Sequence, residues 1–420
     1  MTTIRVPYGD GWQEAQIPDG VSVQVIDPAC EPVETPVEEL VEEALDHPIG
    51  TPRLEEMVSK QDKVAIIVND HTRPGPNAQL VDALMKRLEA AGVADEQICF
   101  VIATGSHRAS TTEELDKILG EKYRKRIRVR NHDCRDGDHV NIGTTQSGMP
   151  VWIDREVAES SFIITTGLIN PHATAGFSGG RKSIVPGVAG IETLHIHHSL
   201  PIRPFDPAMG YFEENLFHQA ALEAAKMTKV RFIANLVQDT HKQNIACVAG
   251  DLEQAHQAGV EICRKANTVK MDSLAEVVIV SPGGAPRDKD LYQAQKALSV
   301  GEVFAKKEGC TFILCAKADE GIGEGLFRTW LEEAKEPGEV IERFREEGFN
   351  VGNNKAFMYA RAMLKGKVLI VSDQVDRSDL QNMMLDGVPS LQEAVDLVCE
   401  REKPEHIIVL PRAVNIIPAI

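Results

Sequence analysis

Short runs of apolar residues, separated by stretches with helical spacing, recur along this chain. Residues 63–69, 98–103 and 162–166 are three such runs, and residues 78–91 between the first two have the spacing of a helix. The same pattern predicts later strands at residues 230–233, 276–281, 311–316 and 368–372. Apolar runs that alternate with helices are typical of α/β folds with parallel sheets.

The beginning of the chain has a different pattern. Residues 4–7 and 12–17 alternate around Gly9-Asp10-Gly11, which predicts a hairpin, and residues 37–45 predict an acidic helix with a solvated face. The α/β rhythm restarts near residue 274. We therefore expect two α/β domains with largely parallel sheets, 1–273 and 274–420, and an active site in the cleft between them. The run at 407–409 is expected to add a strand to either domain.

Bulk composition is that of a soluble globular protein, with 43% apolar and 26% charged residues in 420. No run approaches the length of a membrane span, and the N-terminus lacks the apolar core of a signal peptide, so a cytoplasmic location is expected. A formal net charge of -18 disfavours binding to nucleic acid or to anionic membranes. Eight cysteines without a Cys-x-x-Cys pair indicate reduced thiols rather than a zinc ribbon.

Polar residues follow directly after several predicted strands. Asp70, Thr72 and Arg73 follow the first, His107 follows the second, and His172 follows the third. Ligands of open α/β sheets bind beyond the carboxyl ends of the strands. These segments are therefore predicted to point their polar side chains toward one edge of a sheet.

The stretch from residue 170 to residue 190 contains five glycines together with Arg181 and Lys182. Glycine lets backbone approach a ligand closely, so the stretch predicts a site for an anionic cofactor. Gly176 to Ser183 nearly match a phosphate-binding P-loop, but Arg181 stands where a glycine is required. A lysine can also bond a cofactor covalently when its amine is activated. A glycine-rich surface loop with a solvated lysine is the alternative.

Histidines are the candidate proton carriers. His107 and His172 together suit a reaction that treats both faces of a planar carbon, one as base and the other as acid, although each alone could be structural. His195 and His198 share one predicted helix face, and His197 points away. One of them could bind a metal whose remaining ligands come from a cofactor. A zinc site with Glu192 and His195 lacks a further ligand.

Other residues have simpler expected roles. The planar fork of Arg73 suits a carboxylate. In the second domain, Asp288 is predicted to cap a helix on which Gln293 and Lys296 share a face, either for substrate or simply in solvent.

These motifs, taken together, resemble the nickel-pincer lactate racemases, a family of 2-hydroxyacid racemases and epimerases. The matching pieces are Asp70-His-Thr-Arg73, Ala103-Thr-Gly-Ser-His107-Arg, Gly167-x-x-x-Pro-His172, Gly179-Gly-Arg-Lys182-Ser-x-x-Pro-Gly187, His198 and Gln293-x-x-Lys296.

The resemblance implies a nickel pyridinium-3,5-bisthiocarboxylic acid mononucleotide tethered to Lys182, with His198 as the protein ligand of nickel. It implies that His107 and His172 are the catalytic pair. It further assigns cofactor binding to Asp70, His71, Thr72 and Arg73, and substrate contacts to Arg73, Gln293 and Lys296. Cofactor-synthesis and nickel-insertion enzymes would be partners, and a homo-oligomer is allowed.

The implied reaction inverts Cα of a 2-hydroxyacid through a 2-keto acid. One histidine takes the hydroxyl proton while hydride passes from Cα to the cofactor, and hydride then returns to the opposite face. The polar stretch 350–355 suggests a substrate more polar than lactate, such as a malate-like or sugar acid. Arg108, Arg181 and Arg203 could bind a second carboxylate, the cofactor phosphate or solvent. A nucleotide-dependent enzyme using residues 176–183 and a non-catalytic nickel or cofactor carrier are the alternatives.

Overall fold

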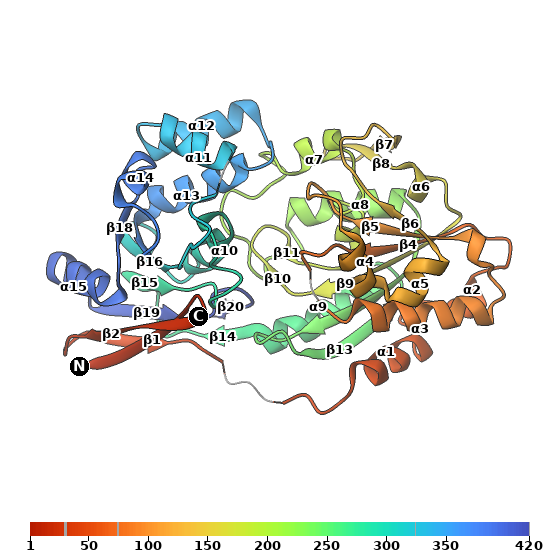
Figure 1. The fold of residues 1–420 in the computed structure, drawn as a ribbon, viewed down its shortest axis with the longest axis horizontal. Coiled ribbons are helices and arrows are strands. Elements are labelled where there is room, and N and C mark those ends of the chain that lie inside the picture. The colour runs from red at the N-terminus through yellow and green to blue at the C-terminus, as the bar shows by residue number, and fades with distance from the viewer. Residues whose placement is uncertain (29–31, 74, 324, 420) are drawn as a thin grey trace. The chain divides into compact units, whose positions relative to one another are not determined.

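The computed structural model describes residues 1–28, 32–73, 75–323 and 325–419, with the elements labelled in Figure 1. Of these residues, those within 30–204 and 210–267 form one compact unit, the first unit. Those within 1–29, 205–209 and 268–420 form the second unit. Cys30 lies outside the described residues, and the seven described cysteines are free thiols.

A six-stranded sheet forms the centre of the first unit. Its order is β13 (Asn244–Gly250), β12 (Val230–Gln238), β9 (Phe162–Ile169), β4 (Val64–Asn69), β5 (Ile98–Ala103) and β6 (Arg128–Asn131). All neighbours are parallel except β13, which runs antiparallel to β12. The first five residues of β4 and of β5 are buried, because central strands of a parallel sheet are covered on both faces.

Helices cover this sheet on its two faces. α1 (Val37–Asp46) and α3 (Asn77–Ala90) share a core with alternate residues of β4 and β5, whereas α9 (Gln254–Asn267) packs on β12 and β13 from the other side. α4 (Thr112–Leu119) begins with the predicted capping box of Thr111 and Glu114. The other elements are α2 (Leu54–Met57), α5 (Glu121–Arg126), β7 (His139–Thr144), β8 (Pro150–Asp154), α6 (Arg155–Ala158), β10 (Pro171–His172), β11 (Gly176–Phe177), α7 (Ile191–His197), α8 (Leu216–Met227) and the 3-10 helices η1 (Asp95–Gln97) and η2 (Gly180–Ser183).

The second unit has its own sheet of six parallel strands. The order is β18 (Asp386–Val388), β17 (Gly366–Val371), β16 (Cys310–Cys315), β15 (Val277–Val280), β19 (His406–Leu410) and β3 (Ser22–Val25). The remaining elements are the predicted hairpin β1 (Thr2–Tyr8) and β2 (Gly11–Ile17), β14 (Thr268–Lys270), β20 (Ile417–Ala419), α10 (Leu291–Gly301), α11 (Leu326–Glu333), α12 (Pro337–Glu347), α13 (Asn353–Lys365), α14 (Arg377–Asn382) and α15 (Leu391–Glu402). The predicted α/β class with largely parallel sheets is confirmed.

The extent of the two units differs from the predicted ranges of 1–273 and 274–420. β3 pairs in parallel with β19, and the hairpin β1–β2 contributes to the same core as β15 and β16. The beginning of the chain therefore belongs with its C-terminal part. The predicted strand at 407–409 is β19, and it lies in the sheet of the second unit. Pairing between such distant segments leaves no local signal in the sequence.

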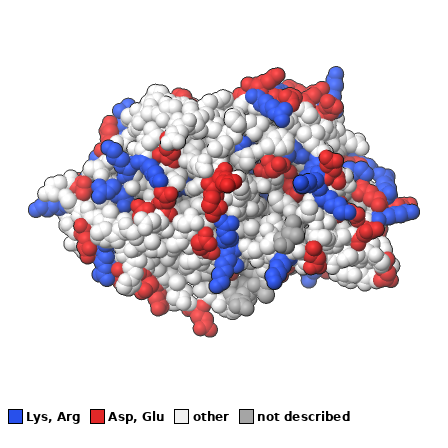
Figure 2. Space-filling model, turned by 180° about the vertical axis from the view of Figure 1, so that it is seen from behind, with Lys and Arg blue, Asp and Glu red and all other residues white. Residues whose placement is uncertain are grey.

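The surface carries charges of both signs. On the face in Figure 2, basic and acidic side chains are interspersed, so no extended basic area is visible there for a polyanion. Within the described ranges, no helix combines the length and the apolar character that crossing a membrane requires.

Candidate functional site

The end of β4 and the end of β5 bring Asp70 and His107 together. Asn69 and Ala103 are paired in the two parallel strands, so the turns that follow begin side by side. Asp70 Oδ2 lies 2.7 Å from His107 Nδ1. Asp70 is 2% exposed and the His107 side chain is 46% exposed. The carboxylate is thus enclosed in protein while the imidazole reaches solvent, as a group that meets a substrate must.

The protonation of this pair follows from its contacts. Burial by itself raises the pKa of Asp70, but the hydrogen bond from His107 and the bond from Thr72 outweigh it and hold that pKa below its usual range. Thr72 donates to Asp70 Oδ1 from Oγ1 at 2.7 Å and from its amide at 3.2 Å. Because an ionised carboxylate only accepts, His107 Nδ1 donates, and the neutral ring keeps its lone pair on Nε2. His107 is therefore arranged as a base.

His172 has the opposite arrangement. It lies on β10, just beyond the end of β9, and its Nδ1 accepts hydrogen bonds from the amides of Thr174 and Ala175, each at 3.1 Å. A ring nitrogen that accepts carries no proton, so the neutral ring of His172 has its proton on Nε2. One histidine is thus arranged to accept a proton at Nε2, and the other to donate a hydrogen bond from Nε2.

Lys182 lies in η2 and is partly buried. Burial lowers its pKa well below the usual value, and the positive charges of Arg73 and Arg181 lower it further. The electrostatic coupling also places Arg73, from the turn after β4, close to Lys182. A neutral amine is the nucleophilic form of lysine. Partial burial and the lowered pKa disfavour the alternative of a solvated surface lysine.

Arg181 forms hydrogen bonds with its own loop rather than with a ligand. It is fully buried and donates to the carbonyl oxygens of Ala175 and Phe177 at 2.9 Å, and to that of Gly179 at 3.3 Å. The expectation that Arg181 could bind a carboxylate, a phosphate or solvent is wrong, because its guanidinium is enclosed among carbonyl groups. Its fixed charge instead acts on Lys182.

The glycines of the stretch make room for the protein's own atoms. A Cβ on Gly176 would lie 2.2 Å from Tyr211 O, and one on Gly187 would lie 2.2 Å from Ser183 O. The amide of Gly180 donates to Asn235 Oδ1 at 2.7 Å. A P-loop needs amides turned toward a phosphate, whereas here carbonyl groups face inward around Arg181. This arrangement disfavours the nucleotide-binding alternative.

His198 follows α7 and is arranged as a metal ligand would be. Its Nδ1 donates to Leu194 O at 3.3 Å, which leaves the lone pair of the neutral ring on Nε2. Burial, with the charges of Arg203 and Lys182 among further causes, holds its pKa well below the usual value. Neighbouring His197 is engaged in a hydrogen bond within the protein, since its Nε2 donates to Phe217 O at 2.9 Å. His195 is half-buried on the same helix.

A pocket of about 280 Å³ lies beside the Asp70 turn. Its lining includes Asp70, Arg73 and His71, together with Glu114 and Lys117 of α4. His71 Nδ1 contacts Ser110 Oγ at 3.3 Å, so this ring faces α4. The predicted cofactor residues Asp70, His71 and Arg73 thus share one pocket, while Thr72 binds the Asp70 carboxylate.

The two other arginines have different environments. Exposed Arg108 forms two hydrogen bonds with Glu114, at 2.7 and 2.8 Å. Arg203 is 3% exposed, and its charge acts on His198.

The second unit holds the remaining predicted residues. Gln293 and Lys296 lie on α10, and Lys296 Nζ donates to Gln293 Oε1 at 3.2 Å, as expected for a shared face. The helix is capped by Asp290, whose side chain accepts from the amide of Gln293 at 2.6 Å. The prediction that Asp288 caps this helix is therefore wrong. Its Oδ2 instead accepts from the amide of Gly9 at 2.7 Å and so holds the first hairpin.

Sequence reasoning missed two features of the first unit. Asp70 was expected to bind a cofactor, but its carboxylate is bonded to His107. The signal was present, because both residues follow strands that were predicted to be parallel. The second is the buried histidine His132, which follows β6 in the same way.

The chain is similar to known proteins over its whole length. The model of the lactate racemase N-terminal domain matches residues 8–208, and that of the lactate racemase C-terminal domain matches residues 269–418. A lactate racemase from Thermoanaerobacterium thermosaccharolyticum is 32% identical over 429 residues, covering 100% of this chain and 98% of that protein. A lactate racemase from Lactiplantibacillus plantarum is 34% identical, covering 89% of each chain.

Two solved structures share the fold of this chain. The structure of the lactate racemase apoprotein from T. thermosaccharolyticum matches with a TM-score of 0.90, 29% identity and 100% coverage of both chains. A Thermotoga maritima protein shares the fold, with a TM-score of 0.69, 18% identity, and coverage of 91% of this chain and 98% of that one.

Proposed function

This chain belongs to the lactate racemase family and is an isomerase, and from that premise we propose that it inverts Cα of a small 2-hydroxycarboxylic acid. The observation that carries the proposal is the partly buried Lys182, because burial and the charges of Arg73 and Arg181 lower the pKa of its amine. A lysine in this state is suited to a covalent bond with a cofactor.

We propose that Lys182 and His198 hold the nickel-pincer nucleotide. Two features of the chain fit this group: the nucleophilic amine of Lys182, and the lone pair that the Leu194 contact leaves on His198 Nε2. Among the described residues, no three His, Cys, Asp or Glu side chains are grouped to hold a metal ion. A metal bound at His198 would take its other ligands from the cofactor, as a pincer provides.

When bound, this group would supply the acceptor for hydride from the substrate Cα. The protein would then handle the proton of the hydroxyl group. His107 Nε2 takes that proton, and Asp70 stabilises the imidazolium that forms. His172 donates a hydrogen bond from Nε2 to the oxygen of the 2-keto acid, and Arg73 binds the carboxylate through its planar fork.

Gln293 and Lys296 are proposed as further substrate contacts, supported by their common face on α10. A substrate more polar than lactate has no support from the stretch 350–355. Fully buried Asn353 accepts from the amide of Asn350 at 2.9 Å and donates to Gly348 O at 2.8 Å, and Lys355 donates to Gln295 at 3.2 Å. These polar side chains are hydrogen-bonded within the protein around the beginning of α13. We therefore propose lactate or a close analogue.

The carrier alternative makes a different prediction from the enzyme. A carrier would need Lys182 and His198 but no basic histidine, whereas an isomerase needs His107. The Asp70–His107 contact favours the enzyme, since an orienting carboxylate behind an exposed imidazole serves proton transfer.

The test is to produce the chain together with enzymes that make the cofactor and insert nickel, which we propose as its partners. Intact-protein mass spectrometry and metal analysis should find one adduct and nickel in the wild type. Neither should be found in Lys182→Arg, which keeps a cation but lacks the amine. Among single enantiomers of lactate, malate and sugar acids, the loaded wild type should racemise lactate fastest. Loaded protein without an adduct on Lys182 would contradict the proposal.

A cytoplasmic location is also proposed. It is supported by the seven described cysteines, all free thiols, since thiols persist in a reducing compartment. Peptide mapping of protein from its native cells, alkylated during lysis, should find these cysteines unpaired.

A further inference from the structure

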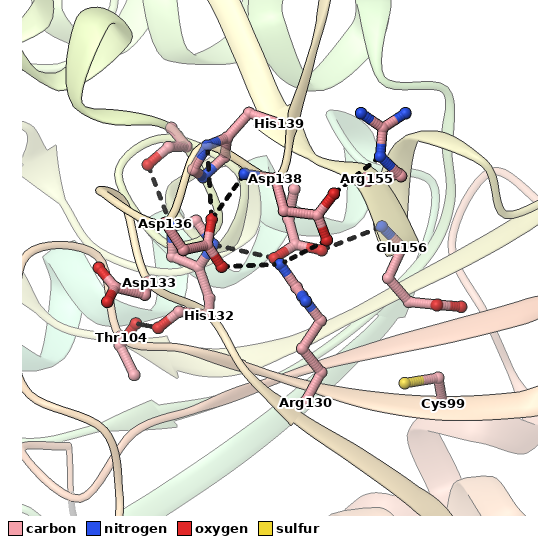
Figure 3. A network of polar contacts seen from close by, with 12 residues as sticks. Cys99, Thr104, Arg130, His132, Asp133, Asp136, Asp138, His139, Arg155 and Glu156 are labelled. Carbon is pink, nitrogen blue, oxygen red and sulfur yellow. Dashed lines mark hydrogen bonds and ion pairs between the residues drawn. The ribbon is translucent and has the colours of Figure 1, made fainter.

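A buried histidine outside the proposed catalytic pair connects the two segments that carry His107 and Lys182. His132 follows β6 directly and is 1% exposed. Figure 3 shows it among the polar side chains Arg130, Asp136, Asp138 and His139. No step of the proposed reaction uses this residue.

On one side, His132 is bonded to the turn that carries His107. Thr104 Oγ1 donates to the carbonyl oxygen of His132 at 2.5 Å, and the amide of His107 donates to Thr104 O at 2.9 Å. The amide of His132 also donates to Ile102 O at 3.3 Å. The end of β5 is thereby fixed to the residue that follows β6.

On the other side, the His132 ring is bonded to the segment that follows Lys182. Its Nε2 lies 3.1 Å from Ala189 O. The chain between Lys182 and Ala189 is itself bonded, since the amide of Gly187 donates to Lys182 O at 3.1 Å. The amide of Gly105 donates to Gly187 O at 3.0 Å, which is a direct bond between the two segments.

The second ring nitrogen faces a carboxylate. His132 Nδ1 lies 3.1 Å from Asp154 Oδ2, which also accepts from Arg130 Nε at 2.7 Å. Burial by itself raises the pKa of Asp154, but the bonds from His132 and Arg130 outweigh it and lower that pKa. Both groups that face the ring, an ionised carboxylate and a carbonyl, can only accept. Both nitrogens must therefore donate, which requires an imidazolium.

Charged groups on the surrounding elements are compatible with a cation there. Arg130 on β6 is bonded to Asp136 and Asp138 at 3.1 and 3.2 Å. The ring of His139 on β7 lies 5.3 Å from that of His132, and burial and the charge of His132 lower the pKa of His139. The other charged groups of this network are Asp133, Arg155, Glu156 and Glu192. Carboxylates outnumber the arginines.

We propose that His132 is a positioning residue that fixes the His107 turn to the Lys182 segment. It does so as an imidazolium that donates one proton to Asp154 and one to Ala189 O. The backbone pairing of β8 with residues 188–190 does not reach the His107 turn, so His132 adds a connection that the sheet does not supply.

The test compares His132→Phe with His139→Phe in the full chain without cofactor. Both changes replace a buried ring of one network, but only the first removes bonds to Asp154 and Ala189. Deuterium exchange at peptides that contain Gly105 and Gly187 should be at least about 10-fold faster in His132→Phe and within about 2-fold of wild type in His139→Phe. Equal acceleration in both variants, or none in His132→Phe, would overturn the proposal.

Two further measurements keep the test decisive if His132→Phe does not fold. His132→Gln keeps one donor and should give an intermediate exchange rate. In the wild type, nitrogen NMR of labelled histidine should show protons on both ring nitrogens of His132 at neutral pH. A neutral ring there would overturn the imidazolium.

These measurements involve neither cofactor nor substrate, so their outcome is independent of the proposed function. Only one consequence rests on that function: loaded His132→Gln should lose kcat with little change in KM.

Discussion

Asp70 Oδ2 and His107 Nδ1 lie 2.7 Å apart, although the two residues come from separate turns behind neighbouring strands. The carboxylate fixes the tautomer of the imidazole and stabilises its charged form. We expect Asp70→Asn to lower kcat by about 10²- to 10⁴-fold in the loaded enzyme, because an amide does neither. Initial racemisation rates measure this. Asp95→Asn, which removes a surface carboxylate paired with Arg126, is the matched control and should be unchanged.

The Lys182 amine gives a pH-dependent stability. Burial and the nearby arginines lower its pKa in the folded chain from 10.5, so the unfolded chain holds a proton there over a range in which the folded chain does not. Unfolding then takes up a proton, and stability rises with pH up to about 10.5. Lys182→Met removes the effect and should be the more stable protein at neutral pH. Urea unfolding of the cofactor-free chains should show this difference shrinking as pH rises, and a constant difference would contradict the lowered pKa.

His195 lies on α7 and His198 directly follows this helix, but the two should differ in their effect on nickel. His198→Ala removes the proposed metal ligand and should lower nickel content at least about 10-fold, while the adduct on Lys182 persists. His195→Ala should bind nickel as the wild type does. Metal analysis and intact mass on the same samples separate the two effects. Equal nickel in both variants would exclude His198 as the ligand.

A buried ion pair lies in the second unit. Arg361 on α13 donates to both carboxylate oxygens of Glu302, at 2.6 and 2.8 Å, and the two side chains are 5% and 1% exposed. Arg361→Met leaves a buried carboxylate without its cation and should cost about 3–5 kcal/mol of unfolding free energy. The double variant with Glu302→Leu removes both charges and should cost less than the single one. Chemical unfolding of both proteins measures the two values.

The sequence predicted β4, β5, β9 and β12 of the first unit's sheet but not β6 or β13, since the buried runs at β4, β5 and β9 have a clear apolar pattern. It also placed Asp70 and His107 at one edge correctly. β6 escaped prediction because three of its four residues are Arg128, Arg130 and Asn131. His132 was missed with it, although it follows a strand as His107 does.

Two other differences arise from contacts that sequence spacing does not contain. Arginine is a residue type that often binds ligands, yet the partners of Arg181 are carbonyl groups of its own loop. Because every sequence contains backbone carbonyls, the spacing of residues does not reveal such partners. Asp288 and Asp290 both stand before α10, and only the geometry of the first hairpin decides which one caps it.

The pairing of β3 with β19 has a consequence for the order in which the chain can fold during synthesis. Ser22 pairs with His406, so β3, which leaves the ribosome early, has no partner until nearly the whole protein has been made. The first unit is complete after residue 267, much earlier. Its sheet can therefore form while β3 still lacks its partner strand. The second sheet reaches its full width only at the end of translation.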